Sequence, residues 1–161
     1  MKLTTCLWFD GNAREAAEFY VSIFPGSCLA SNWVAPTDTP SNEVNTEVVV
    51  EFEIFDQPFI ALNGGPDFQF NPAISFQIPC RDQAEIDHYW QLLTSNGGEV
   101  GRCGWLADKF GVSWQVVSPE MSQYIGGPNS AGAAAATQAM MQMDKIVLAE
   151  LRDAYESASL K

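Results

Sequence analysis

The chain carries one set of helix signals twice, 70 positions apart, and this repeat constrains its fold more than any other feature. In the first copy, Asn12 is expected to cap a helix, with Glu15 at the third helical position. In the second copy, Asp82 and Glu85 hold the same positions. Each cap is followed by a four-residue apolar stripe at helical spacing and then by a terminator: Ala16, Phe19, Tyr20, Ile23 and Pro25-Gly26 in the first copy; Ile86, Tyr89, Trp90, Leu93 and Asn96-Gly97-Gly98 in the second. Agreement at every position indicates an internal duplication.

Segments flanking both helices predict β-strands. A strand is expected before each helix, at 3–9 and 73–79. After the helices, alternating or continuous apolar residues predict further strands at 46–54, 58–62, 99–106 and 112–117. Segment 30–44, rich in Pro, Ser, Thr and Asn, predicts a mobile loop or a weak edge strand. Each half therefore has the order strand, helix, then two or three strands.

One expected strand shows how its faces divide. Ile74, Phe76 and Ile78 alternate with more polar residues and should cover the helix of their own half. Ser75 and Gln77 then face the other way, toward an interior cavity or the opposing half.

The length and the tail complete the expected domain organisation. The 161 residues suit a single domain at 1–161, with a first module at 1–65 and a second at 72–119. Residues 131–160 are Ala-rich and carry an apolar stripe, which predicts one C-terminal helix. Its methionines, among them Met140 and Met143, suit core or dimer contacts better than a cofactor site.

The charge balance excludes two classes of partner. The chain has 20 acidic and 8 basic residues, a net charge of −12. Nucleic acid and anionic membranes require clustered Lys and Arg, so neither is an expected partner. No apolar run approaches the length of a membrane span, and the first residues do not suit a signal peptide. The expected location is therefore the cytoplasm.

The four cysteines and the single histidine provide no obvious site. No two cysteines form a CxxC pair, and one histidine cannot complete a Cys/His zinc motif. Reduced, mostly buried thiols are expected, with Cys103 structural rather than nucleophilic because no base can be paired with it. His88 lies off its helix's apolar stripe and should be solvated.

Several stretches, together with the repeat, resemble a known family. They are 7–12 (LWFDGN), 18–20 (EFY), 61–66 (ALNGGP), 103–108 (CGWLAD), 110–115 (FGVSWQ) and 139–146 (AMMQMDKI). With the paired βαβββ units they resemble the vicinal oxygen chelate (glyoxalase/bleomycin-resistance/dioxygenase) superfamily and, more narrowly, its PhnB-like branch. The resemblance implies an α+β fold in which two βαβββ modules form a cup-shaped, partly open β-barrel, with a C-terminal helix.

The resemblance also implies where a divalent metal would bind. In the superfamily, four inward side chains hold the metal, usually His or Glu from the first and last strands of each half. The matching positions here are Thr5, Ala61, Ser75 and Gln115. These residue types do not make a stable divalent site, and shifting the strands by one or two residues does not supply one. We therefore expect no metal and no other cofactor.

The resemblance leaves a ligand pocket with a polar, uncharged floor as the main hypothesis, and water-filled barrel packing as its rival. The candidate lining residues are Thr5, Leu7, Asn63, Ser75, Gln77, Trp105, Trp114 and Gln115. Glu47, Glu51 and Glu53 could act as paired carboxylates, but their alternation better fits the solvated face of an edge strand.

Three functional hypotheses follow. The first is a metal-independent small-molecule-binding protein, homodimeric, that holds an apolar or aromatic ligand against tryptophan with Gln115 and Gln77 orienting it. The second is a metal-dependent lyase, isomerase or dioxygenase whose ligands have been misplaced, and the third is an interaction module with a packed cup. The methyltransferase label that some members of the branch carry has no support here, because the chain lacks a GxGxxG after a strand and the alternating β/α pattern of an S-adenosylmethionine fold.

Overall fold

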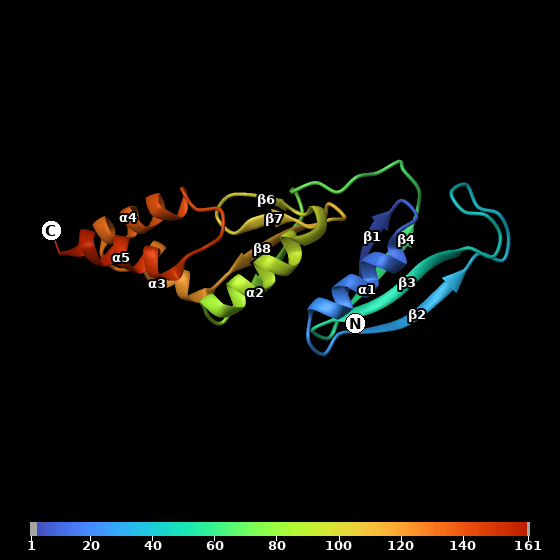
Figure 1. The fold of residues 1–161 in the computed structure, drawn as a ribbon, viewed down its shortest axis with the longest axis horizontal. Helices are drawn as coiled ribbons and strands as arrows, with labels where there is room; N and C mark the ends of the chain where they lie inside the picture. The colour runs from blue at the N-terminus through green and yellow to red at the C-terminus, as the bar shows by residue number, and fades with distance from the viewer. Residues whose placement is uncertain (1–2, 161) are drawn as a thin grey trace. The chain divides into compact units, whose positions relative to one another are not determined.

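The chain forms two compact units, Met1–Phe70 and Asn71–Lys161, in a computed structural model that describes residues 3–160. Each unit contains a four-stranded mixed sheet and a helix from one βαβββ module (Figure 1). The described strands belong to two separate sheets and do not close into one barrel. The α+β class and the duplicated module are thereby confirmed.

The first unit follows the expected element order. It consists of β1 (Thr5–Phe9), α1 (Ala13–Ile23), β2 (Cys28–Val34), β3 (Glu47–Ile54) and β4 (Gln57–Asn63). The sheet order is β1-β4-β3-β2, with β1 and β4 parallel and the other pairs antiparallel. β2 is the weak edge strand that was expected near 30–44, and its whole length is exposed.

A stack of aromatic rings fixes which face of this sheet α1 covers. Tyr20 of α1 is fully buried, and its ring stacks on Phe52 of β3 with centroids 5.9 Å apart. Phe52 in turn stacks on Phe59 of β4 at 5.2 Å. Residues on the same face of the sheet as Phe52 and Phe59, including Leu7 and Ala61, therefore face the helix.

The second unit repeats the arrangement. It contains β5 (Phe76–Pro79), α2 (Gln83–Thr94), β6 (Glu99–Val100), β7 (Trp105–Ala107) and β8 (Ser113–Val117), in the sheet order β5-β8-β7-β6. Two boundaries differ from expectation. The strand at 99–106 is interrupted by a turn at 101–104, and Ile74 lies outside β5 with 77% of its surface exposed instead of covering the helix.

The tail is helical but not continuous. It forms a short 3₁₀ turn (Pro119–Met121), α3 (Ser122–Ile125), α4 (Ser130–Met140) and α5 (Leu148–Ser159). The single helix expected over 131–160 is interrupted at 141–147. The backbone carbonyls of Met143, Asp144 and Ile146 accept hydrogen bonds from outside the tail, so they are not available for helical bonding.

The two helix caps have different outcomes. The Asp82 carboxylate accepts a hydrogen bond from the Glu85 N–H at 3.0 Å, which confirms it as the cap of α2. The Asn12 side chain makes no capping hydrogen bond. In its place, the amide oxygen of Asn63 accepts from the Ala13 N–H at 2.9 Å, so a residue of β4 caps α1.

Exposure corrects one expectation about the cysteines and supports the one about histidine. All four thiols are free, but only Cys80 is buried, while Cys6 and Cys28 are exposed and Cys103 is partly exposed. His88 is exposed on α2, as expected. Over residues 3–160, no helix has both the length and the apolar character to cross a membrane.

Candidate functional site

Strand pairing and one side-chain hydrogen bond in the second unit bring four of the eight candidate residues together. Gln115 of β8 pairs with Gln77 of β5 on one side and with Trp105 of β7 on the other, so the three side chains form one cross-strand row. The Ser75 hydroxyl accepts a hydrogen bond from Gln115 Nε2 at 2.8 Å. We call these four residues the Gln115 row; they lie on the open face of the sheet, opposite the buried residues that face α2.

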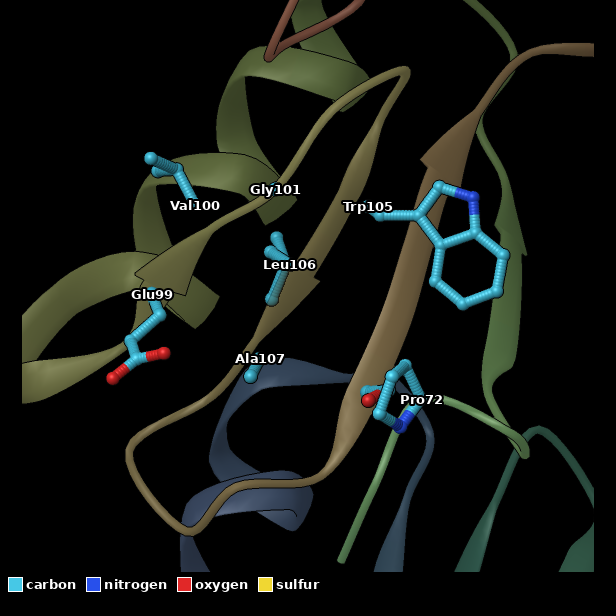
Figure 2. A pocket seen from close by; sticks show the side chains of 8 residues that line it. Pro72, Glu99, Val100, Gly101, Trp105, Leu106 and Ala107 are labelled. Atoms are coloured by element: carbon cyan, nitrogen blue, oxygen red, sulfur yellow. The ribbon is translucent and has the colours of Figure 1, made fainter.

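A pocket of about 250 Å³ lies beside this row. Figure 2 shows the rings of Trp105 and Pro72 toward one end of the view and the side chains of Glu99 and Val100 toward the other. The remaining lining residues are Gly101, Leu106, Ala107 and Ser113. The volume lies just below the range of about 300–1,000 Å³ typical of drug-sized ligands, so it suits a smaller molecule.

The polar groups of the row can both donate and accept hydrogen bonds. Gln115 donates to Ser75 through Nε2, which leaves its amide oxygen as an acceptor and the Ser75 hydroxyl as a donor. Gln77 is exposed. None of the four side chains carries a formal charge, and the row therefore suits an uncharged ligand with a polar edge.

Trp114 lies elsewhere and has a structural role. It is buried at 4% exposure on the α2 side, and its indole N–H donates to Asp108 Oδ2 at 2.8 Å. The other carboxylate oxygen of Asp108 accepts from the backbone N–H groups of Phe110 and Val112, at 2.8 and 3.1 Å. Trp114 is thus held in the core and does not share a face with the Gln115 row.

The three candidates in the first unit also lie on the helix side of their sheet, toward α1. Thr5 pairs with Phe59, and Leu7, which is buried, pairs with Ala61 on the helix side of the sheet. Asn63 caps α1 through its amide oxygen and donates through Nδ2 to the Glu47 carbonyl at 2.9 Å. Its side chain is therefore occupied by structural hydrogen bonds.

The open face of the first sheet carries residues that the sequence analysis did not select. Trp8, Leu62, Val49 and Trp33 form one row across all four strands. The Trp8 indole donates to the Gly65 carbonyl at 2.7 Å and packs edge-on against Phe68, with centroids 5.0 Å apart. The alternation of Trp8 with Leu7 and Phe9 was the signal that could have placed Trp8 on this face.

The metal expectation can be tested on the side chains at the four positions of these two faces where a metal would bind. The parallel pairs Leu7–Ala61 and Ile78–Val116 are both buried on the helix side of their sheets, and aligning them makes Thr4 and Ile60 the first-sheet counterparts of Ser75 and Gln115. None of these four side chains is a carboxylate or an imidazole. Within the described part of the chain, no three His, Cys, Asp or Glu residues are grouped to hold a metal ion. The residues do not fit a divalent metal, and we assign no chemistry to one.

The glutamates of β3 have local partners. Glu47 accepts a hydrogen bond from Arg14 Nε at 2.9 Å, and this contact holds the pKa of Glu47 below its usual range. Glu51 accepts from the Ser31 hydroxyl at 2.5 Å and is exposed. Their alternation was predicted, but β3 is an internal strand between β4 and β2, so the expected edge position is wrong.

Two βαβββ modules, each with one helix on a mixed four-stranded sheet, define a glyoxalase-type fold. Residues 1–117 match the family model described as 3-demethylubiquinone-9 3-methyltransferase, and the chain belongs to this family. Comparison with curated proteins finds no match.

Solved structures agree with this assignment. A protein from Bacillus cereus, described as a putative 3-demethylubiquinone-9 3-methyltransferase and PhnB protein, is 33% identical, with a TM-score of 0.63 over 71% of this chain and 97% of that one. Protein PA1353 from Pseudomonas aeruginosa is 21% identical, with a TM-score of 0.56 over 71% of this chain and 94% of its own, and supports the fold alone. The resemblance to the PhnB-like branch is confirmed. The family match ends at residue 117, so the tail lies outside it.

Proposed function

We propose that this protein binds a small, flat, uncharged ligand on the open face of its second sheet without a metal ion. The ligand's ring stacks on Trp105, and its polar edge hydrogen-bonds to Gln115 and Gln77. The observation that carries the proposal is the Gln115 row, which lies beside a pocket of about 250 Å³ that Trp105 helps to line.

The chemistry of the row favours this ligand class over charged ones. Trp105 offers an aromatic face, and an offset ring on such a face gains about 0.5–1.5 kcal/mol beyond its buried area. The hydrogen bond from Gln115 to Ser75 holds the amide in one orientation before the ligand arrives, which reduces the entropy lost on binding. Glu99 at the pocket and the net charge of −12 both disfavour anions.

Methyl transfer is not part of the proposal, although the family model and the Bacillus cereus protein carry that name. An S-adenosylmethionine fold of the alternating β/α type needs a mostly parallel sheet with a glycine-rich turn after its first strand. Here each sheet has a single parallel pair, β1–β4 or β5–β8, and no GxGxxG follows a strand.

Titration with 1-naphthamide, a flat and uncharged aromatic amide, tests the ligand site. We expect saturable quenching of tryptophan fluorescence and a rise in melting temperature, because a ligand at 100 times its Kd adds about 2.7 kcal/mol to the folded state. Trp105→Ala and Gln115→Leu should each weaken binding about tenfold or more. Trp90→Ala on α2 and Gln57→Leu on β4 are the matched controls and should bind as the wild type. Equal affinity in all five proteins would overturn the site.

The metal-free part of the proposal has its own test. Protein purified without chelator is analysed for bound metals and then titrated with Zn, Ni, Mn and Fe(II). We expect substoichiometric metal and no specific binding, because the four candidate ligand positions carry no carboxylate or imidazole and no three His, Cys, Asp or Glu residues of the described chain are grouped to hold a metal ion. Stoichiometric binding at micromolar affinity or better would instead support a metal-dependent enzyme.

The proposal includes a homodimer in the reducing cytoplasm. Edge strand β2 exposes apolar surface that pairing of two chains would cover, with Leu29, Trp33 and Val34 between 38% and 47% exposed. Sedimentation equilibrium should give twice the chain mass, and Trp33→Ser should shift the equilibrium toward monomer. A wild-type monomer would contradict the homodimer.

The four free thiols support a reducing compartment, which thiol trapping in intact cells would test.

A further inference from the structure

We infer that residues 142–148 of the tail, here called the strap, position Trp105 for the ligand and so control affinity at the proposed site. The inference rests on the proposed function for its effect on binding, but its structural part can be tested without any ligand. The strap lies beyond residues 1–117, which match the family model, although the stretch 139–146 resembles the PhnB-like branch.

The strap is bonded first to the turn at 101–104. The N–H of Cys103 donates to the Met143 carbonyl at 2.8 Å, and the N–H of Gly104 donates to the Asp144 carbonyl at 2.7 Å. Both turn residues have positive φ, +57° and +84°, a conformation that Cys103 adopts only at a cost. Arg102 adds a hydrogen bond to the Gln142 carbonyl at 3.2 Å. The strap therefore satisfies two adjacent N–H groups of a strained turn.

On its other side the strap is fastened to α2. One side chain, Gln83, bridges two strap residues: its Nε2 donates to the Ile146 carbonyl at 3.0 Å, and its Oε1 accepts from the Leu148 N–H at 2.9 Å. Lys145 pairs with Asp87 of α2 at 2.6 Å. Ile146 is fully buried. The strap thus links α2 to the turn before β7.

The turn at 101–104 also holds β7, the strand that carries Trp105. The Trp105 N–H donates to the Arg102 carbonyl at 3.0 Å, and the Trp105 carbonyl accepts from the Gly101 N–H at 2.8 Å. The Gly104 carbonyl accepts from Val116, the neighbour of Gln115, at 2.7 Å. Gly101 itself lines the pocket. Releasing the strap therefore loosens the pocket wall at Trp105 and leaves the pairing of β5 with β8 in place.

The test uses the full-length double variant Gln83→Ala/Arg102→Ala, which removes side-chain bonds on both sides of the strap. The matched control is Gln91→Ala/Arg152→Ala, since Gln91 is exposed on α2 and Arg152 pairs only loosely with its neighbour Asp153 at 3.5 Å. The proteins are labelled with 5-fluorotryptophan and observed by ¹⁹F NMR. The Trp105 resonance is assigned with Trp105→Phe, and buried Trp114 serves as the internal reference for the core.

We expect the Trp105 resonance to broaden or shift in the double variant, while that of Trp114 stays unchanged. Hydrogen exchange at the Cys103 and Gly104 amides should rise about tenfold, the effect of losing roughly one hydrogen bond's stabilisation. Affinity for 1-naphthamide should fall by a similar factor, and the control should match the wild type in all three measurements.

The outcomes separate the strap from the proposed function. An unchanged Trp105 resonance with unchanged exchange would overturn the positioning role, even if 1-naphthamide binds. A change in the resonances of both Trp105 and Trp114 would also overturn it, because the strap would then stabilise the unit as a whole. If the double variant unfolds, the single variant Gln83→Ala is used for the same comparison. If the wild type does not bind 1-naphthamide but Trp105 alone moves, the proposed ligand fails and the positioning role stands.

Discussion

Asp108 illustrates how one buried side chain organises a turn in the second unit. Its carboxylate is 2% exposed and accepts hydrogen bonds from two backbone N–H groups and from the Trp114 indole. Adjacent positions 114 and 115 must point to opposite faces of β8, and this much follows from the sequence. The Asp108–Trp114 bond does not, because it exists only once the turn at 108–111 has folded.

Removing this carboxylate should be costly. Asp108→Ala leaves three donors without their acceptor, and we expect the free energy of unfolding to fall by about 2–4 kcal/mol. Asp108→Asn should cost less, because its amide oxygen can still accept from the backbone. Urea denaturation followed by tryptophan fluorescence measures both, with exposed Asp153→Ala as control. A change as small as that of the control would show that the turn does not depend on Asp108.

The thiols should differ sharply in reactivity. Burial raises the pKa of Cys80 to about 12, and nearby Glu85 adds to the shift, so the unreactive thiol form dominates at pH 8. Exposed Cys28 should be alkylated by iodoacetamide in the folded protein, while Cys80 should react only after unfolding. Mass spectrometry of tryptic peptides measures the labelling. Modification of Cys80 as fast as that of Cys28 would contradict the burial argument.

At the scale of elements, a register difference of one residue separates what the sequence predicted from what the structure shows. The residues that precede the two helices, Asn12 and Asp82, are 70 positions apart, but Leu7 is buried on the helix side of its sheet while Gln77, 70 positions later, is exposed. Because successive side chains point to opposite faces of a strand, a shift of one residue moves every side chain of that strand to the other face. Thr5 and Leu7 therefore face α1, and Trp8 occupies the open face instead. In the second module, Ser75 and Gln77 were expected on the face away from the helix, and the structure places them there with Gln115.

The cap of α1 can be tested directly, because the capping residue, Asn63, belongs to β4 and not to the helix or its flanking residues. Asn63→Ala should lower the free energy of unfolding by about 1–2 kcal/mol, because Ala13 and the Glu47 carbonyl both lose a hydrogen bond. Asn12→Ala should change it by less than about 0.5 kcal/mol, because its side chain makes no capping bond. Chemical denaturation of both variants decides the point. A larger loss from Asn12→Ala would restore the cap that the sequence pattern suggested.

At the scale of the whole molecule, the duplication was predictable because its signals, the helix caps, apolar stripes and terminators, are local in sequence and occur twice along the chain. The break in the tail was not predicted, since the Ala-rich composition and apolar stripe of 131–160 favour one helix. The interruption at 141–147 is due to partners remote in sequence, Gln83 and the turn at 103–104, whose hydrogen bonds compete with those of a helix. Local preference gives way here to tertiary bonding, and the same remote partners underlie the proposed role of the strap.

The net charge of −12 leads to a prediction for the whole chain. Favourable contacts such as Arg14–Glu47, Arg81–Glu85 and Lys145–Asp87 lie at or near the surface, where each contributes about 0.2–1 kcal/mol. Twelve uncompensated charges repel one another over a Debye length of about 30 Å at 0.01 M salt and about 8 Å at 0.15 M. We expect repulsion to dominate, so the melting temperature should rise between these two salt concentrations.

Calorimetry or thermal fluorescence in NaCl, repeated in choline chloride, measures this effect and separates screening from binding of a particular cation. A triple variant, Glu43→Lys, Asp67→Lys and Glu156→Lys, changes three exposed acidic residues and halves the net charge. Its melting temperature should depend less on salt than that of the wild type, because less repulsion remains to be screened. A melting temperature that falls as salt rises would mean that the ion pairs outweigh the repulsion, and the triple variant would then become more sensitive to salt.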